Sequence, residues 1–232
     1  KLEILYKDKW VVVINKPAGL LSVSFSGHKG HTAQSIVEEI LRKQGLVNAK
    51  HKPFSVHRLD RDTSGVMMFA LSMPIQKQIM DNWQKMVTER LYVALSKNPY
   101  KNQKDDLQDF GTIDDKKKKN AYNVGFVPKK NQNDKTSKKF STIKAITHYK
   151  KIKKGKTHTL FELSLETGKK NQIRAHLQFH NYPIVGDFDH NSKGNPFNRL
   201  CLHAKTLEFI HPVTKEKMRF DVPAPKEWEA LL

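Results

Sequence analysis

The sequence predicts an α+β fold in which a mixed, largely antiparallel sheet is flanked by helices and loops. Apolar runs of strand length and amphipathic helical stripes are interspersed along the chain, without the regular strand–helix alternation of a parallel α/β fold. No internal repeat is visible, and 38% of the 232 residues are apolar, which is enough to bury a core. Length alone is compatible with one domain or with two small ones.

The N-terminal part predicts two short strands, a turn and a helix. Residues 4–6 and 10–15 have the β-branched and aromatic composition of strands, and the Lys-Pro-Ala-Gly stretch at 16–19 predicts a turn. Thr32 is a favourable N-cap for a helix that Gly45 ends. The apolar face of this helix consists of Ile36, Val37, Ile40 and Leu41.

A polar, turn-like segment at 55–65 separates this helix from the apolar run at 66–71. Ser72 then stands at the N-cap position of a second helix, which has Pro74 in its first turn, and residues 91–95 predict a strand. The apolar stripe of this second helix, which we expect to pack into the core, consists of Ile75, Ile79, Trp83 and Met86.

The C-terminal part predicts a strand, a helix and further strands. Alternating apolar residues at 159–165 predict a strand that Thr167-Gly168 ends, and a helix follows at 173–179 until Tyr182-Pro183. Two late strands are expected at 200–209 and 218–222.

The composition favours a polyanionic partner and a reducing compartment. With 42 Lys plus Arg against 23 Asp plus Glu, the formal charge is +19, so nucleic acid is the first candidate, although a basic surface also serves solubility alone. The single cysteine, Cys201, cannot form an internal disulfide. No apolar run approaches the ~20 residues of a membrane helix, and residues 1–10 lack a signal-peptide pattern. We therefore expect a cytoplasmic protein that does not bind membranes.

Residues 96–140 form a lysine-rich stretch that we interpret as long surface loops or an insertion. Lysine runs stand at 116–119, 129–130 and 138–139, and apolar periodicity is poor. Two interpretations of these runs stay open. They form either a solvated, flexible face or an arm that holds phosphates without sequence preference.

Several common chemistries find no support in the sequence. A phosphate-binding P-loop, a dinucleotide-binding glycine motif and a hydrolase elbow around Ser64 are all absent. Residues 60–65 resemble the start of a calcium loop, but Leu71 stands where a bidentate glutamate is required. His176 and His180 have zinc-like spacing, yet Leu177 replaces the general-base glutamate and no third ligand is evident. We therefore expect no metal site.

Two polar clusters remain as candidate functional segments. Residues 57–65 mix turn residues with several charges between apolar elements, which is typical of an active-site loop. At 167–176 a strand ends, a glycine permits a sharp turn, and a helix begins whose positive end attracts anions.

Together the two clusters resemble the RluA-type pseudouridine synthases. His57-Arg58-Leu59-Asp60-x-x-Thr63-Ser64-Gly65 matches the signature loop of that family, and Thr167-Gly168 with Gln172-Ile173-Arg174-Ala175-His176-Leu177 matches the segment that carries its arginine. Further segments that resemble the family, in its order, lie at 15–20, 90–95, 183–187, 202–204 and 209–212. The resemblance covers roughly residues 4–96 and 141–228.

The resemblance implies one pseudouridine synthase catalytic domain over residues 1–232. It implies an enzyme, an isomerase that converts specific uridines in structured ribosomal or transfer RNA to pseudouridine by cleaving and re-forming the glycosidic bond, without cofactor or metal. Relatives often carry a small S4-type RNA-binding domain upstream. We expect none in this chain, and we expect a monomer. The chain begins with Lys1 rather than Met, and whether a segment precedes it stays open.

The resemblance also assigns roles to individual residues. Asp60 is the expected catalytic residue, and attack on the sugar C1′ and removal of a C2′ proton both stay open as its role. Arg174 is its expected ion-pair partner, and Tyr92 offers a ring against uracil and a hydroxyl for removal of the C5 proton. Arg58 is expected to fill the stack after base flipping. Lys169 and Lys170 are candidates for phosphate contacts.

Two departures from the family pattern concern RNA contacts and target choice. Lys169-Lys170-Asn171 stands where the family usually has Arg-Thr-His, and Asp189-His190 falls near its usual Tyr-Gly pair. An alternative function is a catalytically idle RNA-binding module of the same fold, which loss of Asp60, Tyr92 or Arg174 would favour, but all three are present. A nucleoside hydrolase would need a second carboxylate to activate water, and only Asp62 is at hand.

Overall fold

The computed structural model describes residues 1–114, 118–119, 125–126, 144–190 and 194–232. The chain forms two compact units, the first made of residues 1–91 and 203–224 and the second of residues 92–202 and 225–232. The single catalytic domain expected from the sequence stays a prediction. In the described residues, no helix combines the length and the apolarity needed to cross a membrane.

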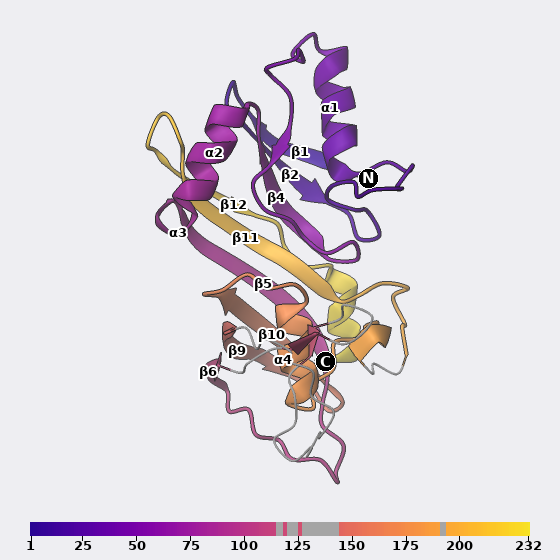
Figure 1. Ribbon diagram of the computed structural model, residues 1–232. Coiled ribbons are helices and arrows are strands. Elements are labelled where there is room, and N and C mark those ends of the chain that lie inside the picture. Colours follow the sequence, from indigo (N-terminus) through magenta and orange to yellow (C-terminus); the bar gives the residue numbers. More distant parts are fainter. Residues whose placement is uncertain (115–117, 120–124, 127–143, 191–193) are drawn as a thin grey trace, which may run out of the picture. The chain divides into compact units, whose positions relative to one another are not determined.

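The first unit is built on a sheet with the strand order β1-β2-β4-β11, in which β12 also pairs with β11 (Figure 1). The short strand β3 pairs with β4. Every one of these pairings is antiparallel except that of β4 with β11, which is parallel. The strands are β1 (Glu3–Lys7), β2 (Val11–Lys16), β3 (Phe54–Ser55), β4 (Ser64–Ala70), β11 (Leu202–Ile210) and β12 (Lys217–Asp221).

The first helix, α1 (Ala33–Lys43), begins where the sequence predicts. Thr32 is its N-cap, with a side chain that accepts from the Ser35 amide, and the Ser35 hydroxyl accepts from the Thr32 amide in return. Gly45 follows the helix with a φ of +72°, the left-handed conformation that ends helices. The capping prediction is confirmed.

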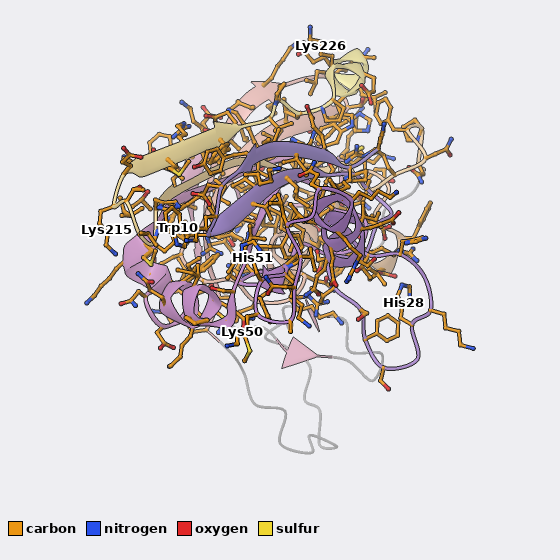
Figure 2. All side chains as sticks on the ribbon, turned by 90° about the horizontal axis from the view of Figure 1, so that it is seen from above. Trp10, His28, Lys50, His51, Lys215 and Lys226 are labelled. Atoms are coloured by element: carbon orange, nitrogen blue, oxygen red, sulfur yellow. The ribbon has the colours of Figure 1, made fainter. Side chains whose placement is uncertain are left out.

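The loop after α1 is held to the turn between β1 and β2 by His51. One ring nitrogen of His51 lies 2.6 Å from the Leu46 carbonyl oxygen and the other 2.9 Å from the Lys9 carbonyl oxygen. Figure 2 labels His51, its chain neighbour Lys50, and Trp10, which follows Lys9 in the turn.

The second predicted helix is interrupted, so the expectation of one continuous helix up to Met86 is wrong. The structure has α2 (Met73–Asp81) and a separate short helix α3 (Trp83–Met86). Asn82 between them has φ −113° and ψ 18°, and its side-chain amide donates to the Gln78 carbonyl oxygen at 2.9 Å. Such local bonding by asparagine competes with helical hydrogen bonds. Ser72 holds the N-cap position of α2 but makes no side-chain capping hydrogen bond.

The core of the first unit lies against β2 and β4. Residues 11–14 of β2 have no exposed surface, so both faces of this strand are covered. One buried cluster joins β2, β4, β11 and the helices α2 and α3. It consists of Val11, Val13, Val56, Val66, Met68, Ala70, Ile75, Ile79, Met86, Leu207 and Phe209.

Gly65 is required where β4 begins beside β11. Its φ is +116°, a conformation that side chains disfavour, and a Cβ built on it would lie 2.1 Å from the Ala204 carbonyl oxygen. Gly65 pairs with Ala204 in the parallel β4–β11 contact. The end of the 57–65 loop is therefore fixed by a close approach of two backbones.

Gly65→Ala is expected to lower the free energy of unfolding by about 3–5 kcal/mol, because it adds backbone strain and a clash with a neighbouring strand. The matched control is Gly19→Ala. Gly19 also has positive φ, at +80°, but a Cβ added there would meet nothing within 4 Å. The control should cost about 1–2 kcal/mol. Urea unfolding measures both, and equal losses would contradict the close approach.

The second unit contains an antiparallel sheet with the strand order β10-β9-β6. Its strands are β6 (Phe110–Asp114), β9 (Ile146–Lys154) and β10 (His158–Leu165), and β5 (Val87–Lys97) enters this unit from the first along the chain. A separate two-stranded pairing joins β7 (Lys118–Lys119) and β8 (Gly125–Phe126). The prediction of a mixed, largely antiparallel α+β fold is confirmed.

The interpretation of residues 96–140 as loops is wrong at residues 110–114, which form β6, and at 118–119 and 125–126, which form β7 and β8. Only Ile113 of β6 is buried, so the strand carries little of the apolar alternation that identifies strands. Most of the lysine runs, at 116–117, 129–130 and 138–139, lie outside the described residues.

The core of the second unit forms between this sheet and helix α4 (Gln172–Phe179). The Phe161 ring contacts the rings of Tyr182, at 5.0 Å between centroids, and Tyr149, at 6.2 Å. Two short 3-10 helices, η1 (Phe188–His190) and η2 (Lys226–Leu231), complete the unit.

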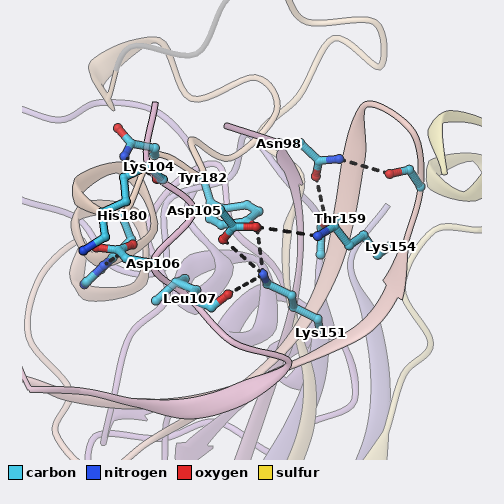
Figure 3. A network of polar contacts seen from close by, with 12 residues as sticks. Asn98, Lys104, Asp105, Asp106, Leu107, Lys151, Lys154, Thr159, His180 and Tyr182 are labelled. Carbon is cyan, nitrogen blue, oxygen red and sulfur yellow. Dashed lines mark hydrogen bonds and ion pairs between the residues drawn. The ribbon is translucent and has the colours of Figure 1, made fainter. Parts of the chain in front are cut away.

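A buried lysine holds the segment before β6 to this core (Figure 3). The side chain of Lys151 on β9 is 4% exposed, and its ammonium donates to the Leu107 carbonyl oxygen at 2.6 Å and to the Tyr182 hydroxyl at 2.7 Å. Asp105 lies 3.4 Å away. Burial alone would raise the pKa of Asp105, but its contacts with Tyr182 and Lys151 outweigh burial and lower the pKa.

Lys151→Met is expected to lower the free energy of unfolding by about 2–4 kcal/mol, because it leaves a buried carbonyl and a buried hydroxyl without their donor. The matched control is Lys153→Met on the same strand. The Lys153 side chain is 55% exposed and pairs with Glu229 at 3.5 Å. The control should change stability by less than about 0.5 kcal/mol. Similar losses in both variants would contradict a specific role for Lys151.

Candidate active site

The loop between β3 and β4 presents Arg58 and Asp60 on either side of a buried anchor. Leu59 is 4% exposed, and its amide donates to the Ser22 hydroxyl oxygen at 3.1 Å while that hydroxyl donates to the Leu59 carbonyl at 2.7 Å. Arg58 is exposed and Asp60 half-buried. Because the backbone is fixed at Leu59, the two neighbouring side chains are held at the surface of the first unit.

A buried lysine supports the turn after Asp60. Lys16 has no exposed surface, and its ammonium donates to the carbonyl oxygens of Pro17, Leu20 and Arg61 at 3.0, 2.7 and 3.0 Å. The Thr63 amide closes the turn by donating to the Asp60 carbonyl at 3.2 Å. The sequence predicts only that Lys16 lies in a turn. Its burial could have been suspected because this lysine directly follows the apolar strand of residues 10–15.

The end of the loop is fixed by a hydrogen-bonded pair of side chains. The Ser64 hydroxyl lies 2.7 Å from His203 Nδ1, and His203 Nε2 lies 3.0 Å from the Val222 carbonyl oxygen. A carbonyl can only accept, so Nε2 carries the proton, and Nδ1 accepts from Ser64. This pair joins β4 and β11 next to Gly65.

His57, at the start of the loop, is neutral at physiological pH. Burial of the ring, and secondarily the charge of Arg90, lower the pKa of His57 to about 3. Its Nε2 accepts from the Met68 amide at 3.0 Å, and its ring lies 5.2 Å from that of Trp83. His57 therefore acts as a fixed acceptor that positions the loop.

The depressed pKa of His57 predicts an acid dependence of stability. As the pH falls from 6.5 toward about 3, the unfolded chain binds a proton at this residue and the folded chain does not, so stability is lost. The loss reaches at most about 1.4 kcal/mol per pH unit. His57→Gln keeps an acceptor for the Met68 amide and removes this contribution. Urea unfolding of both proteins across this range should give converging stabilities as the pH falls, and parallel curves would contradict a desolvated His57.

In the second unit, Arg174 on α4 is held by a network of oxygen acceptors. Its Nε and Nη2 donate to the two carboxylate oxygens of Asp187 at 2.7 and 2.6 Å, a bidentate pair. Nη2 also donates to Asp189 at 2.9 Å, and Nη1 to the Asn171 side-chain oxygen at 3.1 Å. The planar guanidinium is thus oriented by three residues.

Asp187 is a buried carboxylate that stays ionised. It is 1% exposed, and burial alone would raise its pKa. The hydrogen bonds from Arg174 and His190 outweigh burial, so the pKa of Asp187 lies below its usual range. Gly186 makes this placement possible, because its φ is +78° and a Cβ there would lie 2.1 Å from the Arg199 carbonyl oxygen.

Gln172 fastens the segment before α4 to the sheet. Its amide oxygen accepts from the Thr167 hydroxyl at 2.8 Å and from the Lys169 amide at 3.1 Å. Its amide nitrogen donates to the Ile146 carbonyl at 2.8 Å and to the Thr147 hydroxyl at 2.9 Å. The side chains of Lys169 and Lys170 are exposed on this fixed segment.

The predicted site residues fall into two groups. Arg58 and Asp60 share one loop of the first unit, whereas Lys169, Lys170 and Arg174 share one segment of the second unit. Tyr92, half-buried in β5, also belongs to the second unit. The expected pairing of Asp60 with Arg174 joins residues of the two units and stays a prediction.

Sequence reasoning missed Asp187, Asp189 and Gln172 as partners that orient this segment. A role for Asp187 could have been suspected from the sequence, because its carboxylate directly follows Gly186 in a segment that resembles the family. The contacts of Asp189 and Gln172 depend on tertiary structure.

The two histidines considered for zinc make separate contacts. His176 Nδ1 lies 3.0 Å from the Thr147 hydroxyl, and His180 Nδ1 lies 3.0 Å from Asp106. In the part of the chain that the structure describes, no three His, Cys, Asp or Glu side chains are grouped so as to hold a metal ion.

Comparison with known proteins identifies similar sequences over the whole chain. The family model described as RNA pseudouridylate synthase matches residues 10–179. The chain is 32% identical over its full length to the ribosomal large subunit pseudouridine synthase D of Xylella fastidiosa, of which it covers 68%. It is also 32% identical to the tRNA pseudouridine synthase C of Vibrio parahaemolyticus, of which it covers 94%.

Solved structures show a similar fold. The human RNA pseudouridylate synthase domain containing 4 superimposes with a TM-score of 0.70 at 23% identity, covering 98% of this chain and 90% of that one. The human RNA pseudouridylate synthase domain containing 1 gives the same TM-score at 20% identity, covering 96% of this chain and 83% of that one. At such identities the likeness concerns the fold alone.

Proposed function

The chain belongs to the RNA pseudouridylate synthase family, whose members are isomerases, and we propose that it converts specific uridines of ribosomal or transfer RNA to pseudouridine with Asp60 as its catalytic carboxylate. The family match over residues 10–179 carries this proposal. The substrate class rests on relatives named for ribosomal and for transfer RNA, and on the net charge of +19, which suits a polyanion.

The chemistry requires a single well-placed carboxylate. Breaking the bond between uracil N1 and the sugar C1′ develops positive charge on the sugar, which a carboxylate can stabilise or trap. The base then turns over, C5 bonds to C1′, and the C5 proton leaves while N1 gains one. Uridine and pseudouridine contain the same atoms, so the balance needs no co-reactant. Asp60 acts either by attack on C1′ or by removal of the C2′ proton.

The second unit supplies the complementary groups. Arg174, oriented by Asp187, offers a fixed cation for an ion pair with Asp60. Tyr92 offers a ring face for uracil and a hydroxyl for removal of the C5 proton. Lys169 and Lys170 are exposed and suited to contact phosphates. In the first unit, Arg58 is exposed and suited to fill the gap that a flipped base leaves in the RNA.

We propose a monomer that works in the cytoplasm and binds RNA but no membrane. The free thiol of Cys201, which is buried, is compatible with a reducing compartment.

Tritium release from RNA labelled at uridine C5 tests the reaction and the carboxylate together, since isomerisation must expel that atom. Asp60→Asn should lower release at least ~10³-fold, as removal of an essential catalytic group does. The matched control is Asp62→Asn in the same loop, whose carboxylate pairs with Arg61 at 3.1 Å and which should keep wild-type release.

Two outcomes would overturn the proposal. Equal release by wild type and Asp60→Asn would place catalysis elsewhere. Absence of release by wild type on unmodified ribosomal and transfer RNA would favour the idle binding module.

A further inference from the structure

Phe188 is an exposed aromatic ring held between the two carboxylates that bind Arg174. It is 64% exposed, whereas Asp187 on one side is 1% exposed and Asp189 on the other accepts from the same guanidinium. We propose that Phe188 is a stacking site for a nucleobase of the RNA, next to the arginine of the active site. The position beside the active site rests on the proposed function.

The backbone around Phe188 is fixed on both sides. Asp187 makes the bidentate pair with Arg174, and its carbonyl accepts from the His190 amide at 3.2 Å. Asp189 contacts Arg174 at 2.9 Å. The ring is thus presented by a short helical turn whose neighbours are already ordered. Binding a base to a preorganised ring costs little conformational entropy.

The chemistry of Phe188 itself favours a base over a phosphate as the group that it meets, because its ring carries no charge. Next to it, the single charge of Arg174 is shared by the carboxylates of Asp187 and Asp189. The neutral face of a base stacks on an aromatic ring, a contact that supplies affinity without depending on charge.

Other exposed phenylalanines have different surroundings. Phe110 is 75% exposed but lies on β6, opposite Lys150 in the register of the sheet. Phe25 already contacts the His28 ring, at 5.3 Å between centroids. Of these three phenylalanines, Phe188 alone lies between two residues, Asp187 and Asp189, that contact a proposed active-site residue, Arg174.

Replacement of Phe188 tests the stacking site by RNA binding. With unmodified transcripts of large-subunit ribosomal RNA and of transfer RNA, Phe188→Ala should raise the Kd about 5- to 150-fold, the range that loss of one base–aromatic stack produces. Phe188→Tyr should restore it. In tritium release, Phe188→Ala should raise KM and leave kcat near the wild-type value. The matched control, Phe110→Ala, should bind as wild type does.

A second measurement reports the ring directly. Phe188→Trp should lose fluorescence when the transcripts bind, beyond the change in wild type, and Phe110→Trp should not. Unchanged binding by Phe188→Ala, failure of Phe188→Tyr to restore it, or an equal effect of Phe110→Ala would overturn the inference. Absence of tritium release by wild type with a Kd that still depends on Phe188 would overturn the proposed function and leave the stacking site standing.

Discussion

The bidentate pair between Arg174 and Asp187 is the interaction on which the functional segment of the second unit depends. It joins α4 to the turn at residues 188–190, and it keeps a carboxylate ionised where burial opposes the charge. Burying an ion pair brings little net stability, because desolvation offsets most of the attraction. What the pair supplies is orientation. A guanidinium held by two hydrogen bonds to one carboxylate can adopt few orientations, and its hydrogen bonds to Asn171 and Asp189 restrict it further.

In the first unit, the loop that carries Asp60 is held in place by hydrogen bonds to neutral acceptor groups. This loop is fastened by Ser22 at Leu59, by the buried ammonium of Lys16 at Arg61, and by the close backbone approach at Gly65. None of these contacts uses the Asp60 carboxylate. The support of the loop is thus separate from the group proposed to react, and the reactive side chain stays available for the sugar. When the contacts that position a residue do not involve its reactive group, the residue is placed precisely and its reactive group can still meet the substrate.

Much of the fold could be predicted because local signals agreed with tertiary packing. The Thr32 cap, the apolar strand β2 and the helix at 172–179 each follow from residue type and spacing. Strands β6 and β9 could not be predicted in this way. In β9 the inward positions include Lys151, whose ammonium is satisfied by a carbonyl and a hydroxyl that only the folded chain brings near. For the site, motif resemblance indicated Asp60 and Arg174, whereas the residues that orient them depend on contacts distant in sequence.

The burial of Lys16 divides the lysines of this chain into two chemical classes. An amine must shed its proton and meet a reagent in water before it can be acylated, and the Lys16 ammonium is enclosed by three carbonyl oxygens with no exposed surface. The lysines on the surface are in contact with water and open to a reagent. Acetylation of this protein would therefore change the charge it offers to a polyanion while the support beneath Asp60 stays intact. Affinity for a polyanion and integrity of the loop that carries Asp60 are, in this respect, separately adjustable.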